Sequence, residues 1–225
     1  MHSGSMNAID RSYAAKPSQY FSGARDTLVA QLPDAPGAAI LEIGCGSGGT
    51  GALALATGKC GRYSGIEIEP GAASQASALL TEVLIGNIEN MELPYPDSSF
   101  DVIIISEVLE HLVDPWAVVA RLAKLLKPSG IMVATSPNIS HWRVIRALFG
   151  GRFDYCQMGV MDRTHLRWFT PGSFRQMFID AGLVVDSVGP AGGFGKAART
   201  INLLTRGAIE HLFCTQIALF GHRPA

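Results

Sequence analysis

The chain has 225 residues, a length that suits one domain with a full hydrophobic core. Hydrophobic residues make up 48% of it and charged residues 16%, which excludes an intrinsically disordered chain. The formal net charge is −1, so the chain has no general attraction for nucleic acid, although a local basic patch is compatible with that balance.

The two features that bear on the cellular location are the start of the chain and its cysteines. Residues Met1–Ser5 read as an expression scar, with a native start at Met6, and no signal peptide opens the chain. No apolar run reaches membrane-spanning length. The four cysteines are scattered, with no CxxC and no metal-ligand spacing, so we expect reduced thiols in a cytoplasmic protein.

Strands and helices alternate along the chain, which predicts a mostly parallel sheet with helices on both faces. Several strands are short β-branched runs, as expected where a strand is buried on both sides. The predicted strands are Ala39–Ile43, Arg62–Ile68, Glu82–Gly86, Asp101–Ser106, Ile131–Ser136, Leu183–Gly189 and Gln216–Gly221. From their end signals, the predicted helices are Ser18–Leu32, Thr50–Thr57, one beginning at Pro70, one from Asp114 to a stop at Pro128, and one from Thr170 to Gly182.

The segment at about 139–169 breaks this alternation, because it is rich in aromatic and basic residues. It follows the fifth strand, so we expect it to lie over the carboxyl edge of the sheet, where ligands bind in open α/β sheets. We interpret it as a substrate-covering insertion in a single domain that spans residues 6–225. Arg143, Arg146 and Arg152 either form a solvated helix face or favour an anionic acceptor.

A glycine-rich turn follows the first predicted strand. Gly44, Gly46 and Gly48 fit the pattern GxGxG, and the pattern GxGxxG of dinucleotide sites fits as well. Glu42, two residues before the first glycine, would repel a phosphate and suits a ligand that carries positive charge. Glu67 ends the second strand and can accept both ribose hydroxyls of a nucleoside.

The string SFDVIIISEVLEHL over Ser99–Leu112 follows at the fourth strand. Together with the glycine turn it resembles the class I S-adenosylmethionine-dependent methyltransferases, in particular their small-molecule branch with an FD…EHL signature. The resemblance covers roughly residues 38–137 and is weaker over 160–221. It implies a Rossmann-like, doubly wound α/β sheet of seven strands, mostly parallel with an antiparallel last strand. It also implies S-adenosyl-L-methionine as cofactor and S-adenosyl-L-homocysteine as product, at the carboxyl ends of the first, second and fourth strands.

The resemblance also implies roles for individual residues. For the methionine part of the cofactor, the implied residues are Glu42 near the ammonium group, Gly44, Gly46 and Gly48 around the chain, and Ser106 beside the methionine part or the methyl group. For the nucleoside part, they are Glu67 on the ribose, Ile68 against adenine and Asn87 at the adenine amino group. Tyr20 is expected to cover the pocket. The family usually has Asp where this chain has Asn87, whose amide oxygen can still accept a hydrogen bond. Asn87 as a turn residue and Tyr20 as a packing residue are the alternatives.

Methyl transfer is an in-line displacement at carbon, so the protein has to position the nucleophile and exclude water. An aliphatic hydroxyl also needs a general base, and His111 and His165 are the candidates. His165 lies in MDRTHLRWFT, which resembles the DRTHLRFFT stretch of methyltransferases in glycan and related sugar pathways and suggests that it borders the acceptor site. Asp162 or Arg163 could orient it. Either histidine could instead be structural, His111 by bonding a main-chain carbonyl. We predict no metal, because the sequence shows no cluster that would bind one.

The sequence therefore predicts an enzyme that methylates a small-molecule acceptor, such as a sugar or another hydroxyl compound. Three alternatives stay open: a nucleic-acid or protein methyltransferase, a NAD(P)-dependent oxidoreductase, and a module that binds the cofactor without catalysis. The near-neutral charge argues against nucleic acid, whereas the arginine-rich stretch 143–167 argues for it. The acceptor, the methylated atom and the oligomeric state cannot be read from the sequence.

Overall fold

The computed structural model describes residues 25–192 and 196–225, so Tyr20 and the start of the predicted helix Ser18–Leu32 lie outside the described residues. Its strands form a seven-stranded sheet in the order β3-β2-β1-β4-β5-β7-β6, which confirms the predicted fold class. The chain divides into two compact units, residues 1–104 and 105–225, and the division falls within β4 (Phe100–Ser106).

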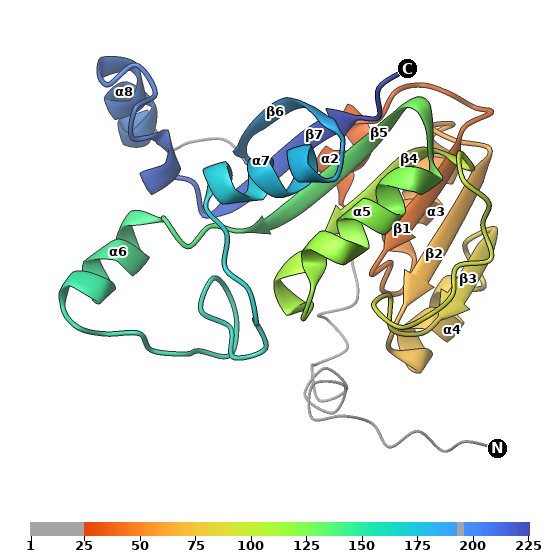
Figure 1. Cartoon of the computed structure of the whole chain (residues 1–225), viewed down its shortest axis with the longest axis horizontal. Coiled ribbons are helices and arrows are strands. Elements are labelled where there is room, and N and C mark those ends of the chain that lie inside the picture. The colour runs from red at the N-terminus through yellow and green to blue at the C-terminus, as the bar shows by residue number, and fades with distance from the viewer. Residues whose placement is uncertain (1–24, 193–195) are drawn as a thin grey trace. The chain divides into compact units, whose positions relative to one another are not determined.

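The first unit contains three parallel strands with helices packed against them. β1 pairs with β2 from Ala39 opposite Arg62, and β2 pairs with β3 from Ser64 opposite Glu82. α3 packs against β2, and α4 packs against β2 and β3 (Figure 1). The elements are α2 (Asp26–Gln31), β1 (Ala39–Ile43), α3 (Gly49–Ala56), β2 (Arg62–Glu67), α4 (Pro70–Ala76) and β3 (Glu82–Ile85).

Local sequence explains both the strands and the helix starts of this unit. Ile40 and Leu41 of β1 are fully buried, as expected for a strand covered on both faces. Pro70 begins α4, and the Glu69 carboxylate caps it by accepting hydrogen bonds from the backbone N–H groups of Gly71 and Ala72 at 3.0 and 2.6 Å. Because these strands are parallel, the carboxyl ends of β1, β2 and β3 lie at the same edge of the sheet.

The second unit ends in an antiparallel arrangement. β7 pairs antiparallel with β5 on one side and with β6 on the other, which confirms the predicted antiparallel last strand. α5 packs on β5 and beside α7, and α7 packs on β6 and β7 (Figure 1). The elements are η2 (Leu109–His111), α5 (Pro115–Leu125), β5 (Leu126–Pro137), α6 (Trp142–Phe149), α7 (Pro171–Asp180), β6 (Val184–Pro190), α8 (Lys196–Leu204), η3 (Glu210–Leu212) and β7 (Gln216–His222).

One predicted helix end is wrong. α5 ends at Leu125 rather than at Pro128, because β5 begins at Leu126 and Pro128 lies inside that strand. A residue before proline is biased toward extended backbone, and the extension is held by the C-terminal chain. There Ser129 N–H donates to the carbonyl of Arg223 at 3.0 Å, and Arg223 N–H donates to the carbonyl of Gly130 at 2.9 Å.

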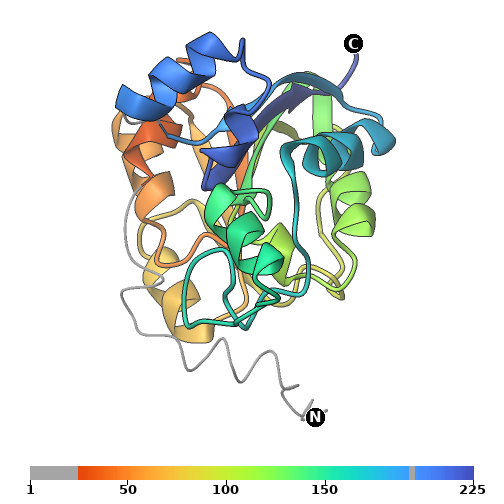
Figure 2. The same ribbon diagram turned by 90° about the vertical axis from the view of Figure 1, so that its left-hand side faces the viewer.

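The insertion leaves the sheet and returns to it at one place. Asn138, just after β5, and Phe169, just before α7, form a parallel β-bridge, and Ile139 N–H donates to the Phe169 carbonyl at 2.9 Å. α6 lies between them, followed by a long loop, and Figure 2 shows this helix and loop together. A helix in this segment was expected only as the alternative of a solvated helix face at Arg143, Arg146 and Arg152, without bounds, and α6 carries the first two of these residues.

Three further observations concern the described residues. α8 and η3 were not predicted from the sequence, since the stretch between β6 and β7 carries no strong end signals. Among the described residues, no helix has the length and apolar character needed to cross a membrane. The four cysteines are free thiols; Cys156 is exposed and the other three are buried.

Candidate functional site

The glycine turn between β1 and α3 adopts the backbone that its glycines were expected to provide. Gly44, Gly46 and Gly48 all have positive φ angles, 71°, 54° and 86°. Gly48 is the N-cap of α3, and a Cβ atom there would lie 3.0 Å from the Cα atom of Ala76 and 3.1 Å from its Cβ atom. At this position both the φ angle and the close approach of α4 require glycine.

Glu67, the last residue of β2, closes this turn from the side. One of its carboxylate oxygens accepts the backbone N–H of Gly46 at 2.8 Å, and the other accepts those of Ile68 and Glu69 at 2.9 Å each. Burial raises the pKa of Glu67, while these three N–H groups lower it. A carboxylate has about four lone-pair sites, so room is left for about one further donor rather than for both ribose hydroxyls at once.

Glu42 lies on β1 two residues before the turn and is fully buried. Its carboxylate accepts a hydrogen bond from the Tyr63 hydroxyl at 2.8 Å, and the Arg25 guanidinium lies 3.4 Å away. Burial raises the pKa of Glu42 to about 7, although Arg25 and the Tyr63 hydrogen bond both lower it. The structure thus gives Glu42 two partners from its own chain, which the sequence analysis did not foresee.

The two residues expected near adenine sit at the ends of neighbouring strands. Ile68, directly after β2, is half-buried, which leaves part of its side chain available to an aromatic ring. Asn87 follows β3, and its side-chain oxygen accepts the backbone N–H of Glu89 at 2.9 Å. This bond is the geometry of an ordinary Asx turn, which is the alternative interpretation of Asn87.

Ser106 ends β4 and is buried in the second unit. Its hydroxyl lies 2.7 Å from the hydroxyl of Thr135 on β5, which also donates to the Glu107 carboxylate at 3.1 Å. Glu107 has a positive φ of 57°, which is uncommon for a residue with a side chain. The chain is therefore turned sharply after β4, a feature that only the structure reveals, because glutamate carries no turn signal.

The two candidate catalytic histidines come together in the second unit. The centroids of the His111 and His165 rings are 4.8 Å apart, and both residues are buried. Nδ1 of His111 lies 3.1 Å from the Thr164 carbonyl, and Nδ1 of His165 lies 3.1 Å from the Val160 carbonyl. A carbonyl oxygen only accepts, so each Nδ1 carries a proton, and in the neutral form of each ring the lone pair is at Nε2.

The loop that carries His165 is fixed by Asp162. Its buried carboxylate accepts the backbone N–H and the hydroxyl of Thr164 at 2.9 and 2.7 Å, and its carbonyl accepts the N–H of His165 at 3.0 Å. Leu166 and Arg167 then donate their N–H groups to the carbonyl of Glu110 at 2.8 and 3.0 Å. Asp162 thus orients His165 through the turn, whereas Arg163 is exposed.

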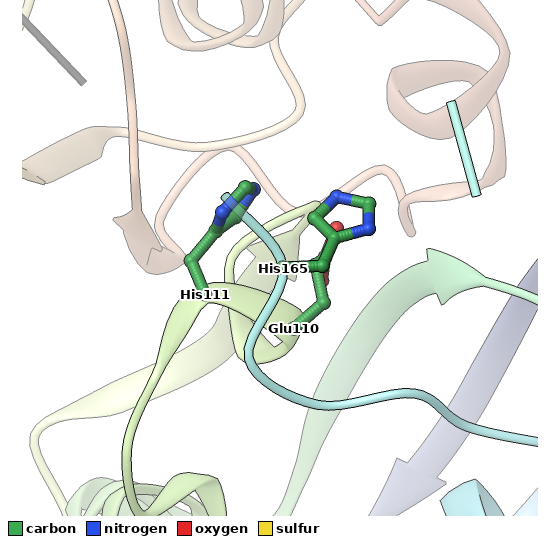
Figure 3. A group of neighbouring side chains, drawn as sticks. All are labelled: Glu110, His111 and His165. Carbon is green, nitrogen blue, oxygen red and sulfur yellow. The ribbon is translucent and has the colours of Figure 1, made fainter. Parts of the chain in front are cut away.

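Glu110 is the functional candidate that the sequence analysis missed. It is buried on η2, beside His111, and its carboxylate accepts the Ser136 hydroxyl at 3.1 Å. One ligand atom each from Glu110, His111 and His165 lies within 4.8 Å of the others, as Figure 3 illustrates. We predicted no cluster of metal-ligating residues, but folding assembles one, because His165 is far from His111 along the chain.

The arginines of the insertion are engaged on its surface. The guanidinium carbons of Arg143 and Arg146 lie 5.5 and 5.9 Å from the Trp142 ring centroid, and Arg152 donates to Asp154 at 2.8 Å. Nearby, Phe153, Tyr155 and Trp168 form an aromatic cluster with ring centroids 5.5 to 6.2 Å apart. For Arg143 and Arg146 these contacts correspond to the solvated helix face, the alternative to an anionic pocket, whereas Arg152 lies after the end of α6 in an exposed loop.

Comparison with known proteins gives a family and two curated relatives. A family model described as a methyltransferase domain matches residues 17–188. The 27-O-demethylrifamycin SV methyltransferase of Amycolatopsis mediterranei is 36% identical over 111 residues, which are 47% of this chain and 40% of that protein. The ubiquinone biosynthesis O-methyltransferase of Xanthomonas campestris is 28% identical over 145 residues, 61% of this chain and 59% of that protein. The chain thus spans roughly half the length of these curated relatives.

Several solved structures have the same fold as this chain. A structure described as a SAM dependent methyltransferase from Archaeoglobus fulgidus superimposes with a TM-score of 0.65 over 92% of this chain and 97% of that one. Its sequence is 19% identical, so this likeness shows the fold alone.

Proposed function

The chain belongs to the class I S-adenosylmethionine-dependent methyltransferase family, whose domain matches residues 17–188, and on that premise we propose that it methylates a hydroxyl oxygen of a small, largely apolar molecule. The methyl group comes from S-adenosylmethionine. This membership separates the chain from the NAD(P)-dependent oxidoreductases. A cytoplasmic location, supported by the free thiols, remains part of the proposal.

The glycine turn with Glu67 beside it is the observation on which the cofactor site rests. Three positive-φ glycines leave the backbone open to the close approach of a ligand, and the Glu67 carboxylate is already oriented by backbone N–H groups at the end of β2. Fixed in this way, the carboxylate accepts a ribose hydroxyl with little loss of side-chain freedom. Glu42 with its pKa of about 7 adds a buried acidic group near a cofactor that carries an ammonium and a sulfonium.

The acceptor is inferred from the insertion and from the relatives. Phe153, Tyr155 and Trp168 supply an apolar, aromatic surface in the segment that we expect to border the acceptor. The arginines that would favour a phosphorylated acceptor are stacked on Trp142 or paired with Asp154. Two of the relatives are named as O-methyltransferases or for an O-demethyl substrate, which favours oxygen as the methylated atom.

The reaction needs few groups. The acceptor oxygen attacks the methyl carbon in line with the carbon–sulfur bond, whose electrons return to sulfur to give S-adenosylhomocysteine. The hydroxyl proton must leave before or during that attack, and we assign this deprotonation to the environment of His111 and His165. Their Nδ1 atoms face carbonyl oxygens and so donate, which makes Nε2 the nitrogen that accepts a proton when the ring is neutral.

The test has two stages. Calorimetry should first show binding of S-adenosylhomocysteine, with NADH as the competitor that should not bind. Incubation with methyl-labelled S-adenosylmethionine and a panel of phenols, hydroquinones, polyketide alcohols and sugars should then label an apolar hydroxyl compound. If the label is found in RNA or in protein instead, the proposed acceptor class is wrong. If S-adenosylhomocysteine does not bind, the proposed methyltransferase activity is wrong.

A further inference from the structure

We propose that Glu110, His111 and His165 form a binding site for a divalent first-row transition-metal ion such as Zn²⁺ or Co²⁺. The site lies entirely in the second unit: Glu110 and His111 come from η2, and His165 comes from the loop before α7 (Figure 3). Two imidazoles and one carboxylate are a common ligand set for such ions, with the remaining positions open to water or substrate.

The geometry of the three ligand atoms fits an ion after a small contraction. Atoms that all lie within 4.8 Å of one another can share a central point no farther than about 2.8 Å from each, which is 4.8 Å divided by √3. Metal bonds to imidazole nitrogen and carboxylate oxygen are about 2.0–2.2 Å long. Each ligand atom therefore has to move by at most roughly 0.7 Å, a shift that small rotations about side-chain bonds can produce.

The hydrogen bonds of the two rings select the tautomer that a metal requires. A metal binds the unprotonated nitrogen of a neutral imidazole, and the other nitrogen typically donates to a carbonyl or carboxylate that orients the ring. Here the Nδ1 atoms of His111 and His165 donate to the carbonyls of Thr164 and Val160, each at 3.1 Å. Both Nε2 atoms are thus in the ligating form.

The carboxylate is oriented in the same manner. The Ser136 hydroxyl donates to one oxygen of Glu110 at 3.1 Å, and the backbone carbonyl of Glu110 accepts two N–H groups from the loop that carries His165. The loop that carries His165 is therefore joined to η2 by backbone hydrogen bonds next to the three proposed ligands. A divalent ion held here would also offset the free-energy cost of keeping the Glu110 carboxylate away from water.

The donor atoms decide the class of ion. Imidazole nitrogen suits Zn²⁺, Co²⁺ or Ni²⁺, whereas Mg²⁺ and Ca²⁺ prefer sites built from oxygen alone. The proposal that such an ion takes part in methyl transfer rests on the proposed function: an acceptor hydroxyl bound to the ion loses its proton to solvent more readily. Its oxygen then forms the bond to the methyl carbon while the carbon–sulfur electrons return to sulfur. With the ion bound, the lone pairs of His111 and His165 are used for coordination, so the ion takes over the activation of the hydroxyl that was assigned above to the surroundings of these two histidines.

The experiment measures metal binding without relying on activity. Chelator-treated protein is titrated with Co²⁺ and followed by its visible absorption, and with Zn²⁺ in competition with a chromophoric chelator. We expect one ion per chain, with Mg²⁺ bound much more weakly. S-adenosylhomocysteine binding is measured separately by calorimetry, so a failed cofactor site and a failed metal site give different results.

The variants are chosen to keep the fold. His165→Asn and His111→Asn retain a donor near the position of Nδ1 but lose Nε2, and Glu110→Gln keeps an acceptor for Ser136. Each should weaken Co²⁺ binding at least about tenfold. The matched control is His222→Ala, which removes a surface histidine beside the Asp186 carboxylate and should leave Co²⁺ affinity unchanged. Equal Co²⁺ affinity in the three variants and the wild type, or no stoichiometric ion at all, would overturn the site.

Discussion

The carboxylate of Glu67 accepts the backbone N–H of Gly46 across 2.8 Å and so ties the end of β2 to the middle of the glycine turn. Two other N–H groups, of Ile68 and Glu69, complete the set on this side chain. The same carboxylate is therefore both a support for the turn and the predicted ribose acceptor. Its substitution should affect the backbone and the ligand together, and the first prediction separates these two effects.

Glu67→Gln should weaken S-adenosylhomocysteine binding at least tenfold, about 1–3 kcal/mol for lost hydrogen bonds to a charged group. The neighbouring Glu69→Gln removes a carboxylate at the cap of α4 but keeps the backbone N–H that donates to Glu67, and it is the matched control. Calorimetry with S-adenosylhomocysteine and with an analogue that lacks the ribose hydroxyls tests the contact. If Glu67→Gln weakens both ligands equally, the side chain only supports the turn and the ribose assignment is wrong.

Glu42 should make stability fall as pH rises. Because its folded-state pKa of about 7 lies above the ordinary value of 4.5, the folded chain binds more protons between these values than the unfolded chain. The free energy of unfolding contributed by Glu42 is thus greatest below about pH 4.5 and decreases toward about pH 7, by about 3 kcal/mol at most. The groups facing Glu42 are Arg25, Tyr63 and Glu67.

The measurement compares urea unfolding of the wild type and of Glu42→Gln across this pH range. The difference between them isolates Glu42 from other titrating groups, such as Glu67, whose pKa is also raised by burial. A difference that stays constant with pH would mean that the Glu42 carboxylate is ionised throughout. Bound S-adenosylmethionine should reduce the slope if its ammonium lies near Glu42, since a cation favours the carboxylate form.

Gly48→Ala should lower the free energy of unfolding by about 2 kcal/mol, because alanine is strained at a φ of +86° and its Cβ atom would press on Ala76. Gly37→Ala is the control, since a Cβ atom there has nothing within 4 Å and the backbone has no positive φ. Thermal and urea unfolding measure both variants. If the two variants have the same free energy of unfolding, α4 can shift away from the added Cβ atom without loss of stability, and the prediction is wrong.

Asn138 should be a stability residue of the second unit. It is fully buried, and its amide donates to the carbonyls of His211 and Cys214 at 2.7 and 2.6 Å while its oxygen accepts two hydrogen bonds from Ser140. Asn138→Ala leaves buried carbonyls without a donor and should cost about 1–3 kcal/mol.

A second substitution at the same position sharpens this test. Asn138→Asp keeps the shape but turns an acceptor toward two carbonyls, so it should be at least as destabilising as alanine. The exposed Asn90→Ala serves as the control for losing an asparagine, and urea unfolding compares all three. An Asn138→Asp variant as stable as the wild type would contradict the assigned direction of these hydrogen bonds.

Local signals in the sequence predict the strands, the glycine turn and most helix starts. Ala39–Ile43 is predicted and observed with the same bounds, and Pro70, Pro115 and Pro171 each begin a helix where expected. These signals are local: apolar runs, proline and capping residues act within a few residues of chain, so their effect survives without knowledge of the fold. The predicted end of α5 is wrong because Leu126 and Pro128 belong to β5, whose first residues are held by backbone hydrogen bonds to Arg223 near the C-terminus.

The surroundings of each acidic group and histidine follow from the fold and could not be read from the sequence. Tyr63 reaches Glu42 because β1 and β2 are neighbours in the sheet, and the register that places them together is not written in either strand alone. Glu110, His111 and His165 meet because the insertion returns to the sheet at Phe169, beside Asn138. Both groups of side chains form only when distant parts of the chain are brought together by strand pairing and loop closure. The free energy of these steps is spread over many residues, so no short stretch of sequence reports it.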